Sequence, residues 1–256
     1  MKWSICAALI LLLSVGLIAA VSAQAPTDSD EVNAIIKEID ELYRSSTSYS
    51  ELSMEIVTPH WQRTLEMYGW SEGMDKTFIR ITEPKKEEGV GTLRIGNEMW
   101  NYLPKTNKII KVPPSMMMSS WMGSDFTNDD LVKEFSLFED YTYEMIRPDS
   151  AVDSLIYINC IPREDLPIVW GNIVFTAREK DHIPISAKYY DEKGALMRVL
   201  YYRDIRDFGD RTIPSTLEMV PQNKEGHRTS IHYRVLKFDV ALGDDVFTLR
   251  HLRSKD

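Results

Sequence analysis

The 256-residue chain carries 39 acidic residues against 30 lysines and arginines, so its formal charge at pH 7 is −9. An acidic chain without a basic run is a poor binder of nucleic acid, and we expect transient contact with an anionic membrane at most. The length suffices for one β-rich domain or two small ones.

The first 23 residues have the pattern of an export signal. Lys2 precedes an apolar run, and VSA stands directly before Gln24, with small residues where signal peptidase cleaves. The run is short and lacks a stop-transfer pattern, so we predict a cleaved signal peptide over 1–23 rather than a retained membrane anchor. The mature chain, 24–256, is then exported.

An amphipathic helix is predicted over residues 30–46, with Asp28 or Asp30 as its cap. Its apolar residues recur at spacings of three and four, and they are Val32, Ile35, Ile36, Ile39, Leu42 and Tyr43. The polar segment 45–50, SSTSYS, is expected to end the helix in a turn.

After this helix, apolar and polar residues alternate, which predicts an antiparallel sheet with one buried face. The strand-like runs before residue 113 are 51–58, 63–70, 76–82, 91–96, 98–104 and 108–112. Those after residue 140 are 141–146, 154–162, 171–179, 184–192, 196–205, 214–221 and 229–238. So many strands have to curl into one strongly bent sheet or partial barrel, with helices over its open side. The apolar tail at 239–253 is expected to dock back on the sheet.

The alternation stops at Pro113 and Pro114 and resumes after about Phe138. Ser115–Phe126 reads SMMMSSWMGSDF, and the FTNDDLVKEFSLF that follows is helical, with Thr127 or Asn128 as its cap. Methionine is unbranched and polarizable, so such a segment suits a surface that re-packs around varied apolar partners. We predict an insertion over the sheet at about 113–138.

Catalytic and metal-binding patterns are missing from the sequence. The five histidines form no HExxH or similar spacing, and there is no GxSxG, GxGxxG or P-loop motif. The acidic pairs Asp129/Asp130 and Asp244/Asp245 fall where helix caps or turns are expected, and Cys160 reads as a small buried side chain. We therefore predict a binding protein with no catalytic residue, no metal and no cofactor.

The stretch Gly91–Lys133, GTLRIGNEMWNYLPKTNKIIKVPPSMMMSSWMGSDFTNDDLVK, resembles the signature of the outer-membrane lipoprotein-sorting protein family, the LolA-like proteins of the bacterial periplasm. The resemblance extends over essentially the mature chain. It implies a mainly β (α+β), strongly curved antiparallel sheet forming an incomplete β-barrel, LolA/LolB-like, with helices closing its open side. The hollow between them holds acyl chains, and 113–138 is the lid of a single lipid-binding domain over 24–256.

By this resemblance, the lid residues that contact lipid are Met116, Met117, Met118, Trp121, Met122 and Phe126. Ser119, Ser120 and Gly123 would let the lid move. The strand motifs EMYGW and EMWNY add Met67, Trp70, Trp100 and Tyr102 as cavity candidates, or alternatively as plain sheet core. Because alternate residues of a strand face opposite sides, only part of this second set can line one cavity.

The implied function is a periplasmic carrier that binds the acyl chains of lipoproteins or free lipids for transfer towards the outer membrane. Its partners would be an inner-membrane transporter and an outer-membrane acceptor. Two alternatives remain open: a periplasmic lipid-binding partner of an inner-membrane exporter, and a protein–protein adaptor that docks through its methionine-rich segment.

Overall fold

The computed structural model describes residues 28–133, 140–164, 166 and 168–254. The predicted signal peptide lies outside the described residues, as do 134–138 of the predicted insertion. The helices are α1 (Asp28–Asp40), the 3-10 turn η1 (Pro114–Met116), α2 (Asn128–Lys133) and α4 (Leu249–Arg253). The strands are β1 (Thr47–Val57), β2 (Gln62–Glu72), β3 (Lys76–Glu83), β4 (Gly91–Ile95), β5 (Glu98–Leu103), β6 (Lys108–Lys111), β7 (Tyr141–Met145), β8 (Leu155–Pro162), β9 (Asn172–Arg178), β10 (Pro184–Tyr190), β11 (Leu196–Asp207), β12 (Thr212–Pro221) and β13 (Arg228–Phe238).

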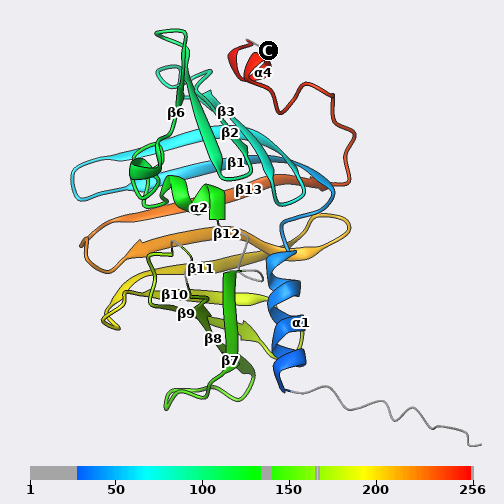
Figure 1. Ribbon diagram of the computed structural model, residues 1–256, viewed down its shortest axis with the longest axis vertical. Coiled ribbons are helices and arrows are strands. Elements are labelled where there is room, and N and C mark those ends of the chain that lie inside the picture. The colour runs from blue at the N-terminus through cyan, green and yellow to red at the C-terminus, as the bar shows by residue number, and fades with distance from the viewer. Residues whose placement is uncertain (1–27, 134–139, 165, 167, 255–256) are drawn as a thin grey trace, which may run out of the picture.

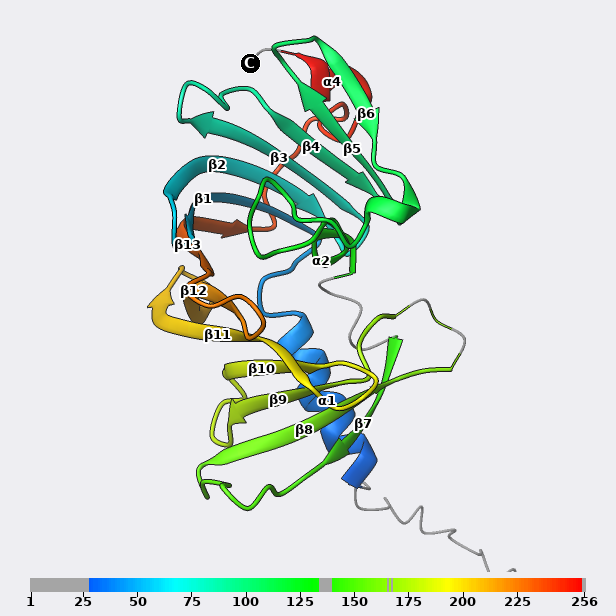
Figure 2. The same cartoon turned by 90° about the vertical axis from the view of Figure 1, so that its left-hand side faces the viewer.

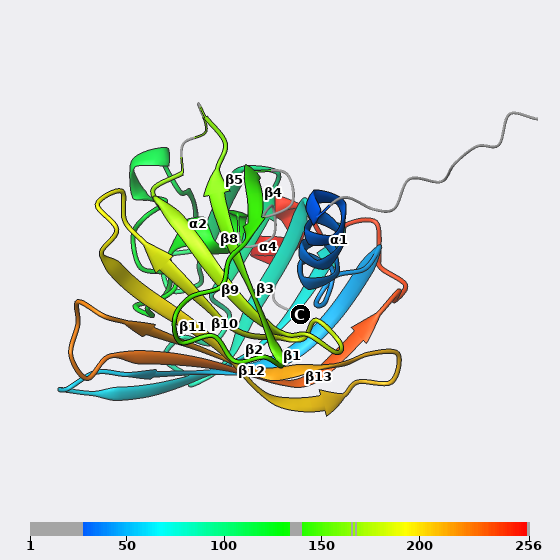
Figure 3. The ribbon, with the colours of Figure 1, turned by 90° about the horizontal axis from the view of Figure 1, so that it is seen from below.

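These strands form one 13-stranded sheet in the order β6-β5-β4-β3-β2-β1-β13-β12-β11-β10-β9-β8-β7. Each half is a meander, and β1 and β13 pair antiparallel to join the two halves. Within the described residues β6 and β7 are the two edges, so the sheet stays open. Figures 1 and 3 show it bent into a deep trough. The predicted mainly β, antiparallel and unclosed architecture is confirmed.

The boundary between α1 and β1 corrects the sequence-based prediction. The helix runs over Asp28–Asp40 and is followed by one turn, so it starts and ends earlier than 30–46. The segment predicted as a turn already belongs to β1 from Thr47, where Ser48 pairs with Ser71 of β2 and with Phe238 of β13. Pairing on both sides overrides the weak strand propensity of a serine-rich segment.

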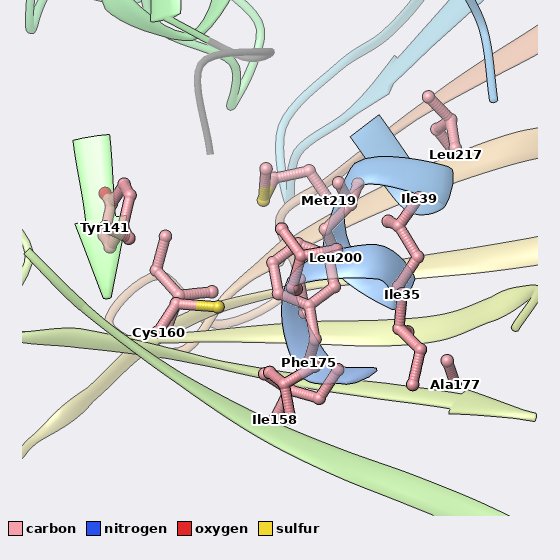
Figure 4. Close-up of a cluster of buried hydrophobic side chains, with 14 of the residues drawn as sticks. Ile35, Ile39, Tyr141, Ile158, Cys160, Phe175, Ala177, Leu200, Leu217 and Met219 are labelled. Atoms are coloured by element: carbon pink, nitrogen blue, oxygen red, sulfur yellow. The ribbon is translucent and has the colours of Figure 1, made fainter. Parts of the chain in front are cut away.

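Helix α1 packs against the concave side of the β7–β12 half (Figures 2 and 4). Four apolar residues of the helix, predicted from their spacing, are buried: Val32, Ile35, Ile36 and Ile39. Their partners on the strands include Ile158, Cys160, Phe175, Leu200, Leu217 and Met219. Cys160 is fully buried, in keeping with its interpretation as a core side chain.

The tail docks on the sheet as predicted, through α4. Leu252 and Val246 are buried with Phe78 and Leu93, and the guanidinium of Arg80 donates to the carbonyls of His251, Leu252 and Ser254 at 2.9–3.2 Å. Arg80 thus caps the carbonyl end of a short helix, where the backbone acceptors otherwise lack partners. A Cβ on Gly91 would lie 2.8 Å from Leu252 Cδ1, so glycine at the start of β4 permits this close approach.

Replacing Arg80 with methionine is expected to release α4 from the sheet, because three backbone carbonyls of the tail lose a charged donor. We expect the free energy of unfolding to fall by about 2–4 kcal/mol and amide exchange to accelerate over 249–254. Denaturant unfolding and hydrogen exchange measure both effects. Arg228→Met, which removes an exposed arginine 3.6 Å from Glu55, is the control and should change stability by less than about 1 kcal/mol. Unchanged exchange over 249–254 in the Arg80 variant would contradict this account of the tail.

Candidate functional site

The two faces of the β1–β5 half are covered by different segments of the chain. Thr92 and Leu93 are adjacent on β4 and face opposite sides: Thr92 Oγ1 accepts a hydrogen bond from Trp121 Nε1 at 3.2 Å, whereas Leu93 packs with Leu252 of the tail. Ile231 and Tyr233 of β13 pack against both the cluster under α1 and the cluster under Trp121. Helix α1 and the segment around Trp121 therefore lie on the same, concave face.

Residues 113–133, here called the lid segment, form a compact hydrogen-bonded loop on that face. Trp121 N donates to Phe126 O at 2.8 Å and Asn128 N donates to Ser119 O at 3.0 Å. The turn between them uses positive φ angles at Met122 (50°) and Gly123 (75°). Thr127 Oγ1 accepts from Asp130 N while Asp130 Oδ2 accepts from Thr127 N, which is a reciprocal cap for α2. Of the two predicted caps, Thr127 or Asn128, the structure confirms Thr127, and the helix starts at Asn128.

The lid segment is attached to several strands of the sheet. Asp125 exchanges two hydrogen bonds of 2.9 Å with Thr229 of β13, and Arg63 of β2 donates to Met122 O. Trp121 is 4% exposed and packs with Leu52, Met54, Leu65, Met67 and Ile81.

A buried ion pair joins α2 to β11. Both terminal guanidinium nitrogens of Arg198, Nη1 and Nη2, donate to the Asp130 carboxylate, at 2.8 and 2.6 Å, and the two side chains are 7% and 14% exposed. The Arg198 guanidinium also lies 4.5 Å from the Trp170 ring centroid and 4.3 Å from that of Tyr189. A bidentate, aromatic-flanked arginine is held in one geometry, so this contact fixes the lid segment over the β7–β12 half.

Two hollows lie on the concave face. The first, the helix hollow, lies between α1, the lid segment and β7–β12, and its empty volume is about 880 Å³ including the part open to solvent. It is lined by Ile39, Asp40, Tyr43, Phe126, Asp129, Asp130, Asp140, Tyr141, Ile168, Trp170, Ile173, Phe175, Tyr189, Leu200, Tyr202, Leu217 and Met219. Aromatic rings and aliphatic chains dominate this lining, with four carboxylates among them.

The second, the lid hollow, lies over β1–β3 and β13 beneath Trp121 and Leu131, with an empty volume of about 860 Å³ on the same measure. Its lining is Tyr43, Arg44, Ser48, Ser50, Leu52, Met54, Met67, Tyr68, Gly69, Trp70, Ser71, Thr77, Ile79, Trp121, Leu131, Ile231, Tyr233 and Leu236.

Comparison with known proteins finds a matching family model and solved structures that share this architecture. A family model described as "Uncharacterized protein" matches residues 73–254, which is more than half of the chain. Similar solved structures include a domain assigned to outer membrane lipoprotein-sorting proteins from Vibrio parahaemolyticus, with a TM-score of 0.76, 19% identity, and coverage of 88% of this chain and all of that one. This chain belongs to the family of that model, and it shares the fold of the solved lipoprotein-sorting domain.

Two further structures agree with this assignment. A LolA superfamily protein from Nitrosomonas europaea matches with a TM-score of 0.71, 19% identity, and coverage of 86% of this chain and 98% of its own. A DUF1329 family protein from Desulfovibrio piger has a TM-score of 0.78 and 22% identity, over 89% of this chain and 100% of its own. Curated protein sequences contained no match. The resemblance found in Gly91–Lys133 is thus confirmed at the level of the fold.

In this LolA-like fold the predicted lid residues divide between inside and outside. Trp121 lines the lid hollow and Phe126, 2% exposed, lines the helix hollow. Met117 packs partly on Met99 and Val112, and Met122 packs partly on the cluster around Trp121. Met116 and Met118 are 51% and 42% exposed. The helical part of the predicted lid beyond Lys133 lies outside the described residues up to 139.

The predicted strand residues divide between the two faces. Met67 lines the lid hollow and is 2% exposed. Trp100 and Tyr102 lie on the opposite face, where they pack with Leu93 and the tail, so the structure does not bring them to either hollow. Trp70 touches the lid hollow, but it packs with the cluster of the opposite face, and its ring lies 4.4 Å from that of Tyr49 at a tilt of 45°.

Sequence reasoning missed Tyr43 as a lining residue, together with the pairing of Arg198 with Asp130. Tyr43 was assigned to the apolar face of the helix, and it does face the sheet, but it lines both hollows. Arg198 lies at an inward position of the alternating run on β11, and a charge at such a position was the available signal of a buried partner. For Asp130 the sequence pattern indicates only a helix cap or a turn.

Burial and negative charge act together on the tyrosines of β7. Desolvation raises the pKa of Tyr141 well above its ordinary value of 10.0, and Tyr189, Cys160, Asp140 and Asp129 add to the rise. The pKa of Tyr143 is raised as well, again mainly by burial. The potential in this part of the helix hollow therefore disfavours an anion.

This raised pKa predicts a loss of stability at alkaline pH. The folded-state pKa of Tyr141 exceeds the unfolded value, so its contribution is fully present below about pH 10 and is lost as the pH rises through the folded pKa. Tyr141→Phe is expected to leave stability at neutral pH within about 1 kcal/mol and to reduce the alkaline loss. Urea unfolding at neutral pH and about one unit above the ordinary tyrosine pKa measures this. The two proteins losing equal stability between these conditions would contradict it.

In the part of the chain that the structure describes, no group of three His, Cys, Asp or Glu side chains is placed to hold a metal ion. None of the described helices has the length and apolar character that a membrane crossing requires.

Proposed function

We propose that this chain is a periplasmic carrier that holds the acyl chains of lipoproteins or free lipids on its concave face and delivers them towards the outer membrane. The observation that carries the proposal is the pair of apolar hollows on one face of an open sheet, both touched by the lid segment. The similar lipoprotein-sorting domain and LolA superfamily protein support it through their shared fold. The proposed role is binding and transfer without catalysis.

In this proposal α1 and the lid segment cover the open side of the trough, and 24–256 acts as one lipid-binding domain with its lid at 113–138. Of the predicted lipid contacts, Trp121, Phe126 and Met67 line the hollows, and Met117 and Met122 are half-buried at the margin. Removing an acyl chain from water gains about 0.8 kcal/mol per buried methylene, so aromatic and aliphatic linings of this extent favour chain binding.

The proposal predicts that protein purified from the periplasm carries lipid. Organic extraction and mass spectrometry should detect lipid or acylated peptide near one equivalent, and delipidated protein should bind a fluorescent fatty acid. Met67→Glu places a carboxylate in the lid hollow and should lower affinity for the probe by about tenfold or more. Met145→Glu, at a methionine of β7 that is 44% exposed, is the matched surface control. Empty extracts together with no probe binding would overturn the proposal.

A second candidate, the protein–protein adaptor, is favoured by the outward methionines of the lid segment. Met116 and Met118 leave about half of their surface in solvent, and Met is over-used at adaptable binding surfaces. An adaptor would lose partner pull-down but keep its lipid content when both are changed to Ser. A carrier whose lid contacts only lipid would lose neither.

A further inference from the structure

Tyr43 stands between the two hollows. Among the residues that the structure describes, Tyr43 alone lines both of them. Its ring stacks on Tyr233 of β13, with centroids 5.6 Å apart and 26° between the planes. The two rings therefore form a partition across the trough, with the helix hollow on one side and the lid hollow on the other.

The position of Tyr43 is fixed by three sets of contacts. Its hydroxyl donates to Pro214 O at 2.7 Å. Arg211 Nη1 donates to the carbonyls of Glu41, Leu42 and Arg44 at 2.5–3.1 Å, which pins the turn that carries Tyr43. Arg211 is in turn stacked on Phe238 at 4.0 Å. These contacts hold the Tyr43 ring in one position, so that it separates the two hollows.

The surroundings of the partition differ from the ends of the hollows. Asp40 and Arg44 flank Tyr43 in sequence, and Asp40 lines the helix hollow whereas Arg44 lines the lid hollow. Both side chains are about 8% exposed. Leu217 and Met219 continue the lining on one side, where Asp129, Asp130 and Asp140 also lie, and Leu52 and Met54 continue it on the other.

This arrangement has two apolar compartments of similar size that meet at one rigid point with polar groups beside it. A single chain cannot fill both without displacing the Tyr43–Tyr233 stack. A ligand with two chains that diverge from one polar junction fills both and leaves the stack in place. Burial of the methylene groups of each chain then contributes to the binding free energy. Because the two chains are linked, the second chain enters its hollow in an intramolecular step once the first has bound.

Resting on the proposed function, we infer that the cargo is a two-chain lipid whose chains part at the Tyr43–Tyr233 partition and enter one hollow each. Tyr43 is then the residue that selects two-chain over one-chain ligands. The glycerol or equivalent junction lies beside Asp40 and Arg44.

Native mass spectrometry of delipidated full-length mature protein tests this, with a single-chain fatty acid and a two-chain phosphatidylethanolamine as probes. Leu217→Trp fills the helix hollow and Ser50→Trp fills the lid hollow. Wild type should saturate with two fatty acids or one phospholipid. Each blocked variant should keep one fatty acid and bind the phospholipid about tenfold or more weakly. Ile168→Trp and Thr77→Trp, at half-buried lining positions, carry the same expectations if a first variant does not fold.

The partition itself is tested by Tyr43→Ala, with Tyr43→Phe as the matched control that keeps the ring. The alanine variant should lose most of its preference for the phospholipid over the fatty acid, and the phenylalanine variant should keep it. Saturation of wild type at one fatty acid, or loss of both fatty acids on blocking one hollow, would overturn the two-compartment inference while leaving lipid carriage intact. Failure of both probes to bind wild type would instead overturn the proposed function, whereas binding of the fatty acid without the phospholipid would overturn only the two-compartment inference.

Discussion

Replacing Trp121 with alanine is expected to lower the free energy of unfolding by about 3–5 kcal/mol and to release the lid segment from the concave face. The ring is 4% exposed, packs on Met54, Met67 and Ile81, and donates to Thr92 Oγ1. Truncation leaves a cavity in the cluster over β1–β3 and removes the largest apolar anchor of the loop. Urea unfolding measures the first effect, and hydrogen exchange over 119–128 measures the second.

Trp61 is the control for this variant, because it is 46% exposed on the hairpin between β1 and β2. Trp61→Ala should change stability by about 1 kcal/mol or less. If the proposed function holds, Trp121→Ala also loses co-purifying lipid, whereas Trp61→Ala keeps it. Equal effects of the two substitutions would show that Trp121 does not anchor the lid segment.

Replacing Arg198 with methionine is expected to cost about 3–5 kcal/mol, because Asp130 keeps a buried carboxylate without its cation. The pair is bidentate and lies under Trp170 and Tyr189, so solvent cannot replace the guanidinium. The uncompensated charge of Asp130 destabilises α2, so the backbone amides of the lid segment should exchange faster with solvent. Arg203→Met, which breaks an ion pair with Glu218 in which the arginine is 51% exposed, should cost less than about 1 kcal/mol.

A double-mutant cycle isolates this contact. Asp130→Asn keeps an oxygen to accept from Thr127 N and removes the charge. The loss of unfolding free energy in the double variant Arg198→Met/Asp130→Asn should therefore be about 2 kcal/mol smaller than the sum of the losses in the two single variants. Additive losses would mean that Arg198 stabilises the fold through its aromatic contacts alone.

The strand pattern of this fold is local information and was readable from the sequence. Alternation along residues such as Leu65 and Met67, and the two-residue turn at Gly96-Asn97, are properties of each segment by itself. The burial of Val32, Ile35, Ile36 and Ile39 likewise follows from helical spacing. The start of β1 was missed because Ser48 and Ser50 become strand only through their partners on β2 and β13.

The candidate site depends on contacts between distant segments, and these have no local signature. Met116, Met118 and Trp121 share one apolar run, but a turn with positive φ at Met122 and Gly123 sends Trp121 inward and leaves the two methionines in solvent. Trp100 and Tyr102 belong to the face that the tail covers, a fact visible only once Leu252 docks on Leu93. Asp130 and Arg198 are 68 residues apart in sequence, so their pairing required the sheet.

Photocrosslinking tests the central claim, that acyl chains lie on the concave face beneath α1 and the lid segment. The mature protein is loaded with a phospholipid that carries a diazirine near the end of one chain, irradiated, digested and sequenced by mass spectrometry. We predict crosslinks on the strands that line the hollows, around Met54 and Met67 and around Leu217 and Met219, with few on β5. Crosslinks concentrated on Trp100, Tyr102 and the tail would place the chains on the opposite face and contradict the account.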